Sequence, residues 1–355
     1  MVREPASPER KPSAFRLAHV LLAVAAAVGL LTVYVATRSP TELPLSPSGK
    51  PTDEQRVVYL GRSLLEAGKE QEAVDLMQAY VKANADDAIV RPVLARGLMA
   101  LGDFEQAERV IDDAIRLAPR NAAALWLKGQ LVRRRGGDAA FFFRQAVESP
   151  DAGAEIWAAY GLELLSEGRL DDAETFLRRA KDAGLADART LGPLGEIALR
   201  KDKLEEAEMS LTGAVQSAPR EARLWAMLAE AQKRSGGRDE AAETLRRGLE
   251  SCGDRPELLM GLGDVLGELA RYEDAAAAYV KAAAFEPLEG EAFLRAARVS
   301  FLAGRLDEAA QQLERAARRL GGDEDVEALR ERIMQARSAQ SQSTSRASSR
   351  PLSGR

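Results

Sequence analysis

Few side chains in this 355-residue sequence are suited to catalysis or metal binding. His19 is the one histidine and Cys252 the one cysteine, which excludes most metal sites built from these ligands and most histidine-based triads. The segment 261–267 (GLGDVLG) has the glycines of a nucleotide-binding loop, but it is one residue too long and no predicted strand precedes it. We therefore predict no catalytic residue, no cofactor and no metal, and we do not expect an enzyme.

Adjacent acidic residues are the remaining candidates for acid–base chemistry. Asp171 and Asp172 form one pair, and Glu205 and Glu206 form another. Both pairs fall at the same phase of a repeating pattern, where a helix is predicted to begin. Acidic side chains in a first helical turn interact favourably with the helix dipole, so we interpret these pairs as structural.

The elements that position every other residue follow a regular repeat. Two series of small residues run through the chain at one constant interval, and each series has a single shorter step. The first series is Gly61, Ala95, Gly129, Gly161, Gly195, Ala229, Gly263 and Ala297. The second series is Ala73, Ala107, Ala139, Ala173, Ala207, Ala241, Ala275 and Ala309. Because two antiparallel helices approach closely only where the crossing side chains are small, each unit is predicted to be a helical hairpin.

The fourth unit shows how such a hairpin is encoded. Trp157 and Gly161 lie on one face of a predicted first helix, which ends at Gly168. Ala173 and Leu177 then recur at helical spacing and face back onto the first helix.

This arrangement resembles the tetratricopeptide repeat (TPR), a helix–turn–helix unit whose period matches the interval of the two series. The seventh unit matches the family pattern well, at Leu262, Gly263, Tyr272, Ala275, Tyr279, Ala282 and Pro287. The resemblance implies an all-α fold, a right-handed superhelical α-solenoid of eight repeats over residues 52–321. The repeats are expected to start near residues 54, 88, 122, 154, 188, 222, 256 and 290.

The third unit departs from the pattern because it is two residues short. Gly129 is in phase with the units before it and Ala139 with those after it, so the missing residues lie near the segment 133–138. The segment 141–143 that follows is three consecutive phenylalanines. We expect some of these rings to fill the core of a disturbed packing step, and a docking patch is the alternative for any that are exposed.

The amino-terminal region is predicted to be a membrane anchor. Residues 17–37 are uncharged and long enough to cross a bilayer as a helix. Tyr34 replaces the small residue that a signal-peptide cleavage site requires, which favours an uncleaved span over a secretory signal. The basic segment 1–16 is then cytoplasmic, and the proline-rich segment 38–51 is a linker to the repeats.

Beyond the repeats we expect a capping helix and a tail. Residues 322–338 carry an apolar stripe suited to closing the end of a solenoid. Residues 339–355 are rich in serine and arginine and are predicted to be disordered.

Charge is distributed unevenly along the chain. The formal net charge is −5, yet residues 1–51 carry six basic against three acidic side chains and residues 337–355 carry four basic ones. Residues 52–336 therefore carry −12. Because so acidic a body repels phosphate backbones, nucleic acid is not expected as a partner.

In the TPR family the first helices line a concave groove that binds peptides or protein segments. The groove position follows the small residue of each first helix, and here it is occupied by Arg62, Arg96, Gln130, Leu162, Glu196, Glu230, Asp264 and Arg298. The first two are basic and the fifth to seventh are acidic, which suggests a groove with oppositely charged ends. Ordinary solvated helix charge is the alternative interpretation.

We expect a membrane-anchored scaffold or adaptor for protein–protein interaction, held in the membrane by residues 17–37. The layout of one span followed by repeats resembles bacterial envelope-assembly proteins. It implies the bacterial inner membrane, with the amino terminus in the cytoplasm and the repeats in the periplasm. A dedicated subunit of an envelope-assembly or polymer-export machine is the alternative function.

Overall fold

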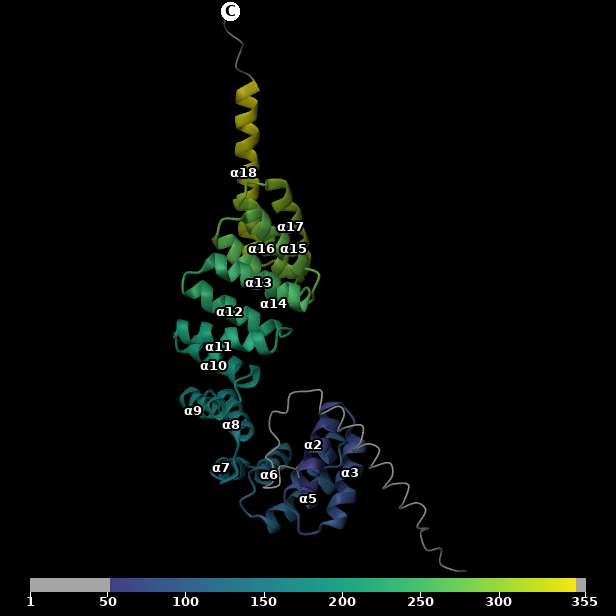
Figure 1. Cartoon of the computed structure of the whole chain (residues 1–355). Coiled ribbons are helices and arrows are strands. Elements are labelled where there is room, and N and C mark those ends of the chain that lie inside the picture. Colours follow the sequence, from purple (N-terminus) through teal and green to yellow (C-terminus); the bar gives the residue numbers. More distant parts are fainter. Residues whose placement is uncertain (1–51, 349–355) are drawn as a thin grey trace, which may run out of the picture. The chain divides into compact units, whose positions relative to one another are not determined.

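The computed structural model describes residues 52–348, which form seventeen α-helices and no strand (Figure 1). The predicted cytoplasmic segment 1–16, membrane helix 17–37 and linker 38–51 lie outside the described residues, as do residues 349–355. Among the residues that are described, no helix is both long and apolar enough to cross a membrane.

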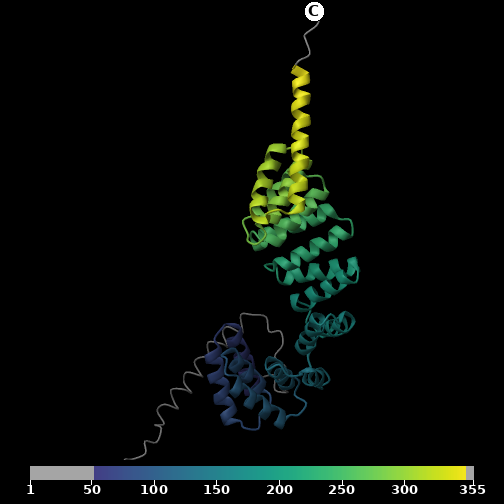
Figure 2. The same cartoon turned by 180° about the vertical axis from the view of Figure 1, so that it is seen from behind.

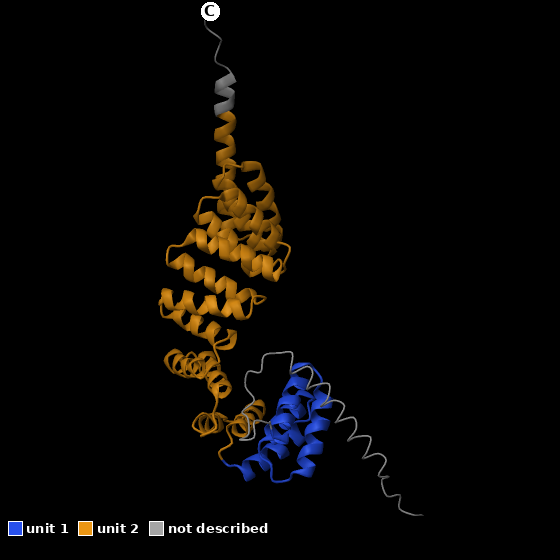
Figure 3. Ribbon diagram, viewed as in Figure 1, with its two compact units in different colours: residues 1–119 blue, residues 120–355 orange. Residues whose placement is uncertain are grey.

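The chain divides into two compact units, residues 1–119 and residues 120–355 (Figure 3). The helices of the first unit are α2 (Asp53–Glu66), α3 (Glu70–Ala83), α4 (Val90–Ala100) and α5 (Phe104–Leu117). They form two antiparallel hairpins, α2–α3 and α4–α5. The core of this unit includes Val74, Met77, Val93 and Leu94.

The second unit contains the other thirteen helices. They are α6 (Ala122–Arg134), α7 (Ala140–Val147), α8 (Ala154–Ser166), α9 (Leu170–Asp182), α10 (Ala188–Arg200), α11 (Leu204–Ser217), α12 (Ala222–Arg234), α13 (Arg238–Cys252), α14 (Pro256–Glu268), α15 (Tyr272–Ala282), α16 (Glu289–Leu302), α17 (Leu306–Leu320) and α18 (Glu324–Ser348). Both views of the chain show α8 to α17 stacked in sequence order as consecutive hairpins (Figures 1 and 2). The described part is therefore an all-α solenoid of helical hairpins.

The two small-residue series lie where the helices of each hairpin cross. Gly61 shows how tight these crossings are, because a Cβ added there would lie 2.7 Å from the Met77 sulfur. The same contact recurs in later hairpins, for example between Gly195 and Leu211, where the corresponding distance is 2.5 Å. The alanines of the second series are all buried. Small side chains thus let each hairpin close around one large apolar residue from its second helix.

Each hairpin turns at the same repeat position, seven residues after the small residue of its first helix. The backbone there has positive φ, at Gly68, Gly102, Gly136, Gly168, Asp202, Gly236, Ala270 and Gly304. Six of these eight are glycine, the residue that adopts this conformation without steric cost.

These turns locate the irregularity of the third unit. Gly136 keeps the regular distance from Gly129, so the two missing residues lie between Gly136 and Ala139. As a result α7 begins after Ala139, whereas α9 begins three residues before the equivalent Ala173. The second helix of this unit has lost its first turn and has only eight residues.

The three phenylalanines divide between core and surface. Phe143 is buried against Gly129 and lies 4.4 Å from Trp126, measured between ring centroids. Phe142 is half-buried, and Phe141 is 64% exposed with its ring edge-on to that of Phe142. Phe143 therefore fills the core, as predicted for some of these rings, while Phe141 lies at the surface.

Helix α18 closes the array with Val326, Leu329 and Ile333, which are buried in the last core cluster. The helix continues to Ser348, well beyond the predicted end at residue 338. Residues 339–348 are thus helical, and the prediction of a disordered tail from residue 339 is wrong for this segment. A helix that is already nucleated by packing is extended at little cost, and the alanine and glutamine of this segment favour helix.

Candidate functional site

All eight predicted groove residues lie on the first helices of their hairpins. In the first unit, Arg62 on α2 and Arg96 on α4 are exposed. The Arg62 side chain makes no ion pair or hydrogen bond with any described residue. Both basic side chains are exposed, as the groove hypothesis requires.

The acidic groove residues of the second unit are engaged by neighbouring cations. Glu196 on α10 accepts from Arg200 of its own helix and from Arg223 of α12, both at 2.6 Å. Glu230 lies 2.6 Å from Lys233. The acidic half of the groove hypothesis therefore needs revision, because a basic partner must compete with these internal pairs.

Asp264 on α14 has partners on two other helices. It accepts a hydrogen bond from the Tyr279 hydroxyl at 2.6 Å and an ion pair from Arg295 of α16 at 2.6 Å. Burial, followed by the hydrogen bond to this carboxylate, raises the pKa of Tyr279. Burial alone lowers the pKa of Arg295, but the hydrogen bond and charge of Asp264 outweigh it and raise that pKa. The trio joins the last two hairpins.

The remaining groove positions differ in character. Gln130 is half-buried, and Leu162 is 41% exposed. Arg298 pairs at 2.6 Å with Asp325 of α18, so the capping helix occupies the last groove position.

A shallow depression of about 450 Å³ lies on the first helices α10, α12 and α14. Glu230 is the one predicted groove residue in its lining, which otherwise consists of Leu199, Arg223, Ala226, Met227 and Glu257. We did not select Arg223 and Met227 from the sequence. Their spacing from Glu230 on α12, seven and three residues, is the helical signal that identifies them as neighbours.

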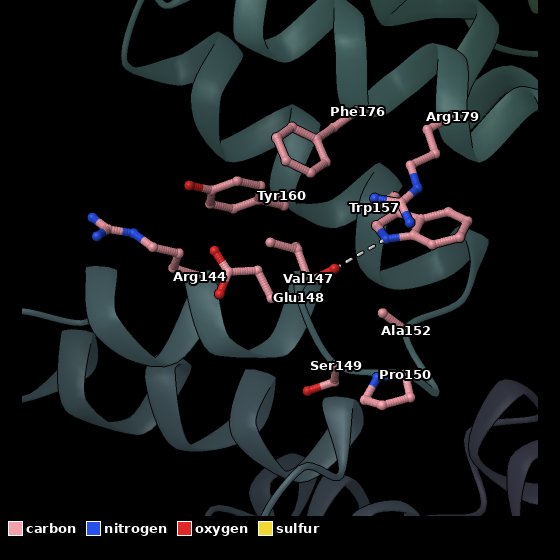
Figure 4. Close-up of a pocket in the computed structure, with 10 residues that line it drawn as sticks. All are labelled: Arg144, Val147, Glu148, Ser149, Pro150, Ala152, Trp157, Tyr160, Phe176 and Arg179. Carbon is pink, nitrogen blue, oxygen red and sulfur yellow. Dashed lines mark hydrogen bonds between the residues drawn. The ribbon is translucent and has the colours of Figure 1, made fainter.

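A second cavity, of about 500 Å³, lies between the short helix α7 and the next hairpin (Figure 4). We call it the α7–α9 cleft. Its lining residues are Arg144, Val147, Glu148, Ser149, Pro150, Ala152, Trp157, Tyr160, Phe176 and Arg179. The cleft was not predicted from the sequence, although it adjoins the shortened third unit.

Aromatic side chains and arginines dominate the cleft. The rings of Tyr160 and Phe176 meet edge-to-face with centroids 4.8 Å apart. The Arg179 guanidinium lies 3.9 Å from the Trp157 ring centroid, in cation–π geometry. The Trp157 indole nitrogen donates to the Val147 carbonyl over 3.5 Å.

The other residues considered for catalysis or ligand binding lie in structural surroundings. Asp172 pairs with Arg169 and Asp171 with Lys201, both at the start of α9. Segment 261–267 lies inside α14, without the strand and loop of a nucleotide site. Cys252 is half-buried, and burial raises its thiol pKa. Within residues 52–348, no cluster of three or more histidine, cysteine, aspartate or glutamate residues is arranged to hold a metal ion.

Comparison with known proteins agrees with this fold. Residues 54–131 and residues 260–324 each match a tetratricopeptide-repeat family model. No curated protein matches the chain.

Several solved structures are similar to parts of the chain. The APC/C heterotetramer Cut9–Hcn1 has 17% identity and a TM-score of 0.51, over 69% of this chain and 48% of that chain. YrrB, described as a TPR protein with an unusual peptide-binding site, has 18% identity and a TM-score of 0.47, over 53% of this chain and 97% of its own. MamA has 20% identity and a TM-score of 0.44, over 47% and 91% respectively. Identities this low indicate a shared fold only. The chain therefore contains tetratricopeptide repeats within an all-α solenoid.

Proposed function

We propose that this protein is a membrane-anchored scaffold that binds peptide or protein segments on the first-helix faces of its repeats. The observation that carries the proposal is the set of eight in-phase hairpins, whose first helices place exposed or half-buried side chains at one repeat position. An α-solenoid buries its core between neighbouring hairpins and leaves an extended surface for binding. Tetratricopeptide repeats are a protein-interaction fold, and the described residues offer no arrangement suited to catalysis.

The charges of the first unit favour an acidic partner segment. Arg62 and Arg96 are exposed on α2 and α4, two helices that pack in the same unit. Exposed cations mainly accelerate encounter and set register, so their contribution depends on ionic strength. The acidic groove residues of the second unit are already paired, which makes a basic partner segment the weaker expectation there.

Membrane anchoring is proposed from the uncharged segment 17–37 and the basic residues before it. From the basic residues before this segment we further propose that the amino terminus is cytoplasmic and the repeats lie outside the cytoplasm. The bacterial inner membrane is proposed from the resemblance of this layout to bacterial envelope-assembly proteins. A fixed subunit of an envelope-assembly or polymer-export machine remains the second candidate. Purification with bound partners distinguishes the two functions. A fixed subunit is expected to recover a single stoichiometric partner, and an adaptor is expected to recover a mixed set of partner proteins.

The test uses the full-length chain with a carboxy-terminal affinity tag, purified from membranes with its partners. Arg62→Gln and Arg96→Gln together are expected to weaken partner recovery and reduce its salt dependence. Lys82→Gln with Arg109→Gln removes two exposed charges from second helices of the same unit and serves as the matched control. Equal recovery with both double variants contradicts the groove assignment. A topology reporter fused after Arg355 tests the orientation. If the fused reporter is found in the cytoplasm, the proposed orientation is wrong.

A further inference from the structure

The α7–α9 cleft lies where the shortened third hairpin meets the fourth. Helix α7 has eight residues, whereas α11 and α13, at the same repeat position, have 14 and 15. The cleft is bounded by the carboxy-terminal end of α7, at Arg144 and Val147, and by the segment that follows it. Trp157 and Tyr160 of α8 are half-buried there.

Equivalent residues in other hairpins are mostly more buried. Trp157 is half-buried, as is its repeat equivalent Leu191, whereas Trp225 and Phe293 are buried, with exposures of 4% and 7%. Tyr160 is half-buried, while its equivalent Leu228 is buried at 4%. Large aromatic rings normally bury most of their surface, so the accessible parts of Trp157 and Tyr160 provide apolar surface at the cleft.

Hydrogen bonds join the segment that follows α7 to residues at the start of α6 and to α7 itself. The segment that follows α7 is fixed where Arg120 donates to the Glu148 carbonyl at 3.1 Å. The Asp151 carboxylate accepts from the Ala122 amide at 3.1 Å, at the positive end of α6. Ser149 donates to the Gln145 carbonyl at 2.7 Å. The cleft is thus bounded by a fixed segment, which lowers the entropic cost of binding.

The charges in the cleft are unbalanced. The Arg144 side chain makes no ion pair or hydrogen bond with a described residue, and the Arg179 guanidinium is engaged only by the Trp157 ring. Glu148 is the single acidic side chain in the lining. Figure 4 shows the Arg144 guanidinium and the Tyr160 hydroxyl directed to the same side of the cleft. This locally basic site lies in an otherwise acidic array, so it is complementary to an acidic side chain.

We propose that the α7–α9 cleft binds a short extended segment of a partner protein that contains proline and an acidic residue. The half-buried rings of Trp157 and Tyr160 offer aromatic surface beside Arg144. Polyproline-II segments dock on aromatic surfaces, because the proline ring packs flat and the segment is already extended. The acidic side chain of the segment pairs with Arg144. The volume of about 500 Å³ lies within the range of pockets that hold small ligands, so a few residues of such a segment fit.

Fluorescence anisotropy with the full-length protein in detergent micelles tests this proposal. The probe is a short labelled peptide of alternating proline and aspartate. One matched peptide has lysine in place of aspartate, and another has glycine in place of proline. The wild-type protein is expected to bind the proline–aspartate peptide saturably, and the two matched peptides about tenfold more weakly.

Variants locate the binding. Arg144→Glu is expected to weaken binding of the proline–aspartate peptide about tenfold and to restore binding of the lysine peptide. Arg144 is exposed, so this change leaves the core intact, which circular dichroism verifies. Arg247→Glu is the control, because Arg247 stacks on Trp225 at the repeat position equivalent to Arg179 but lies outside the cleft. Absence of saturable binding, equal binding of all three peptides, or equal losses in both variants overturns the proposal.

Discussion

The ring of Phe143 lies directly against the backbone of Gly129, where an added Cβ would be 2.5 Å from the Phe143 Cε1. The contact joins the two helices of the shortened third hairpin. It takes the place that Leu177 against Gly161 holds in the following hairpin. The shortened unit therefore keeps its helix crossing and loses only the first turn of its second helix.

Gly129→Ala is expected to destabilise the protein by about 1–3 kcal/mol, the usual cost of forcing an extra carbon into a filled core. Urea unfolding followed by far-ultraviolet circular dichroism measures the shift. Gly153→Ala is the control, because a Cβ there meets no atom within 4 Å. Adding Phe143→Leu to Gly129→Ala is expected to recover part of the loss, since the smaller side chain makes room. A loss that the double variant fails to reduce contradicts this account of the contact.

Ala270→Gly is expected to stabilise the protein by about 1 kcal/mol, because Ala270 has a φ of 56°, in the left-handed region that costs a residue with a Cβ about 1–2 kcal/mol. The offset is the greater freedom of glycine in the unfolded chain. The reverse change at the equivalent position, Gly304→Ala, is expected to destabilise, since φ is 74° there. Thermal unfolding of both variants is the measurement, and shifts of the same sign in the two are inconsistent with a turn effect.

Glu174 is expected to make stability depend on acid pH. Hydrogen bonds from Lys201 first, and then Arg178, outweigh burial and lower the pKa of Glu174 from 4.5 to about 2. A group with a lowered pKa in the folded state stabilises fully above its unfolded value, and loses that contribution as the pH falls from about 4.5 to about 2. With screening by solvent at these partly exposed partners, the contribution is about 1–2 kcal/mol.

Glu174→Gln tests this dependence. It is expected to lower the urea midpoint at pH 7 and to match the wild type as the pH approaches about 2. Glu205→Gln on the exposed face of α11 is the control. A difference between wild type and Glu174→Gln that stays constant across this pH window contradicts the prediction.

Arg295→Gln is expected to destabilise by about 1 kcal/mol, because Asp264 then keeps only the Tyr279 hydroxyl as a partner. Arg271→Gln breaks an exposed pair with Asp274 within one helix and is expected to cost no more than about 0.5 kcal/mol. Chemical unfolding of the two variants in parallel provides the comparison. Equal losses indicate that the pair between hairpins contributes no more than a surface pair.

Much of the fold was predictable from residue spacing. The small residue of each first helix and that of each second helix belong to a single hairpin, so their pairing is a local property. Gly161 and Leu177, for example, lie on consecutive helices and meet because both helices have the same period. The two-residue deletion was also visible, and the backbone at Gly136 places it after the turn.

The candidate sites were less predictable. Glu196 and Asp264 occupy positions that the sequence predicts to be free acidic groove residues. Each is instead paired with an arginine about one repeat away, Glu196 with Arg223 and Asp264 with Arg295. Such pairs depend on the register between consecutive hairpins and on side-chain rotamers, neither of which periodicity encodes. The half-buried Trp157 and Tyr160 of the α7–α9 cleft could not be predicted for the same reason, since Trp157 has the spacing of an ordinary core residue.

The sequence alone thus determined the repeat, the helix pairing within each hairpin and the position of the irregular unit, because burial of small and large residues follows helical period. Only the tertiary structure decided which of the three phenylalanines turns inward, how far α18 extends and that Trp157 and Tyr160 line a cleft beside α7. These outcomes depend on how one hairpin packs on the next. Packing between hairpins is set by the volume and shape of side chains brought together from different units, and not by their spacing along the chain.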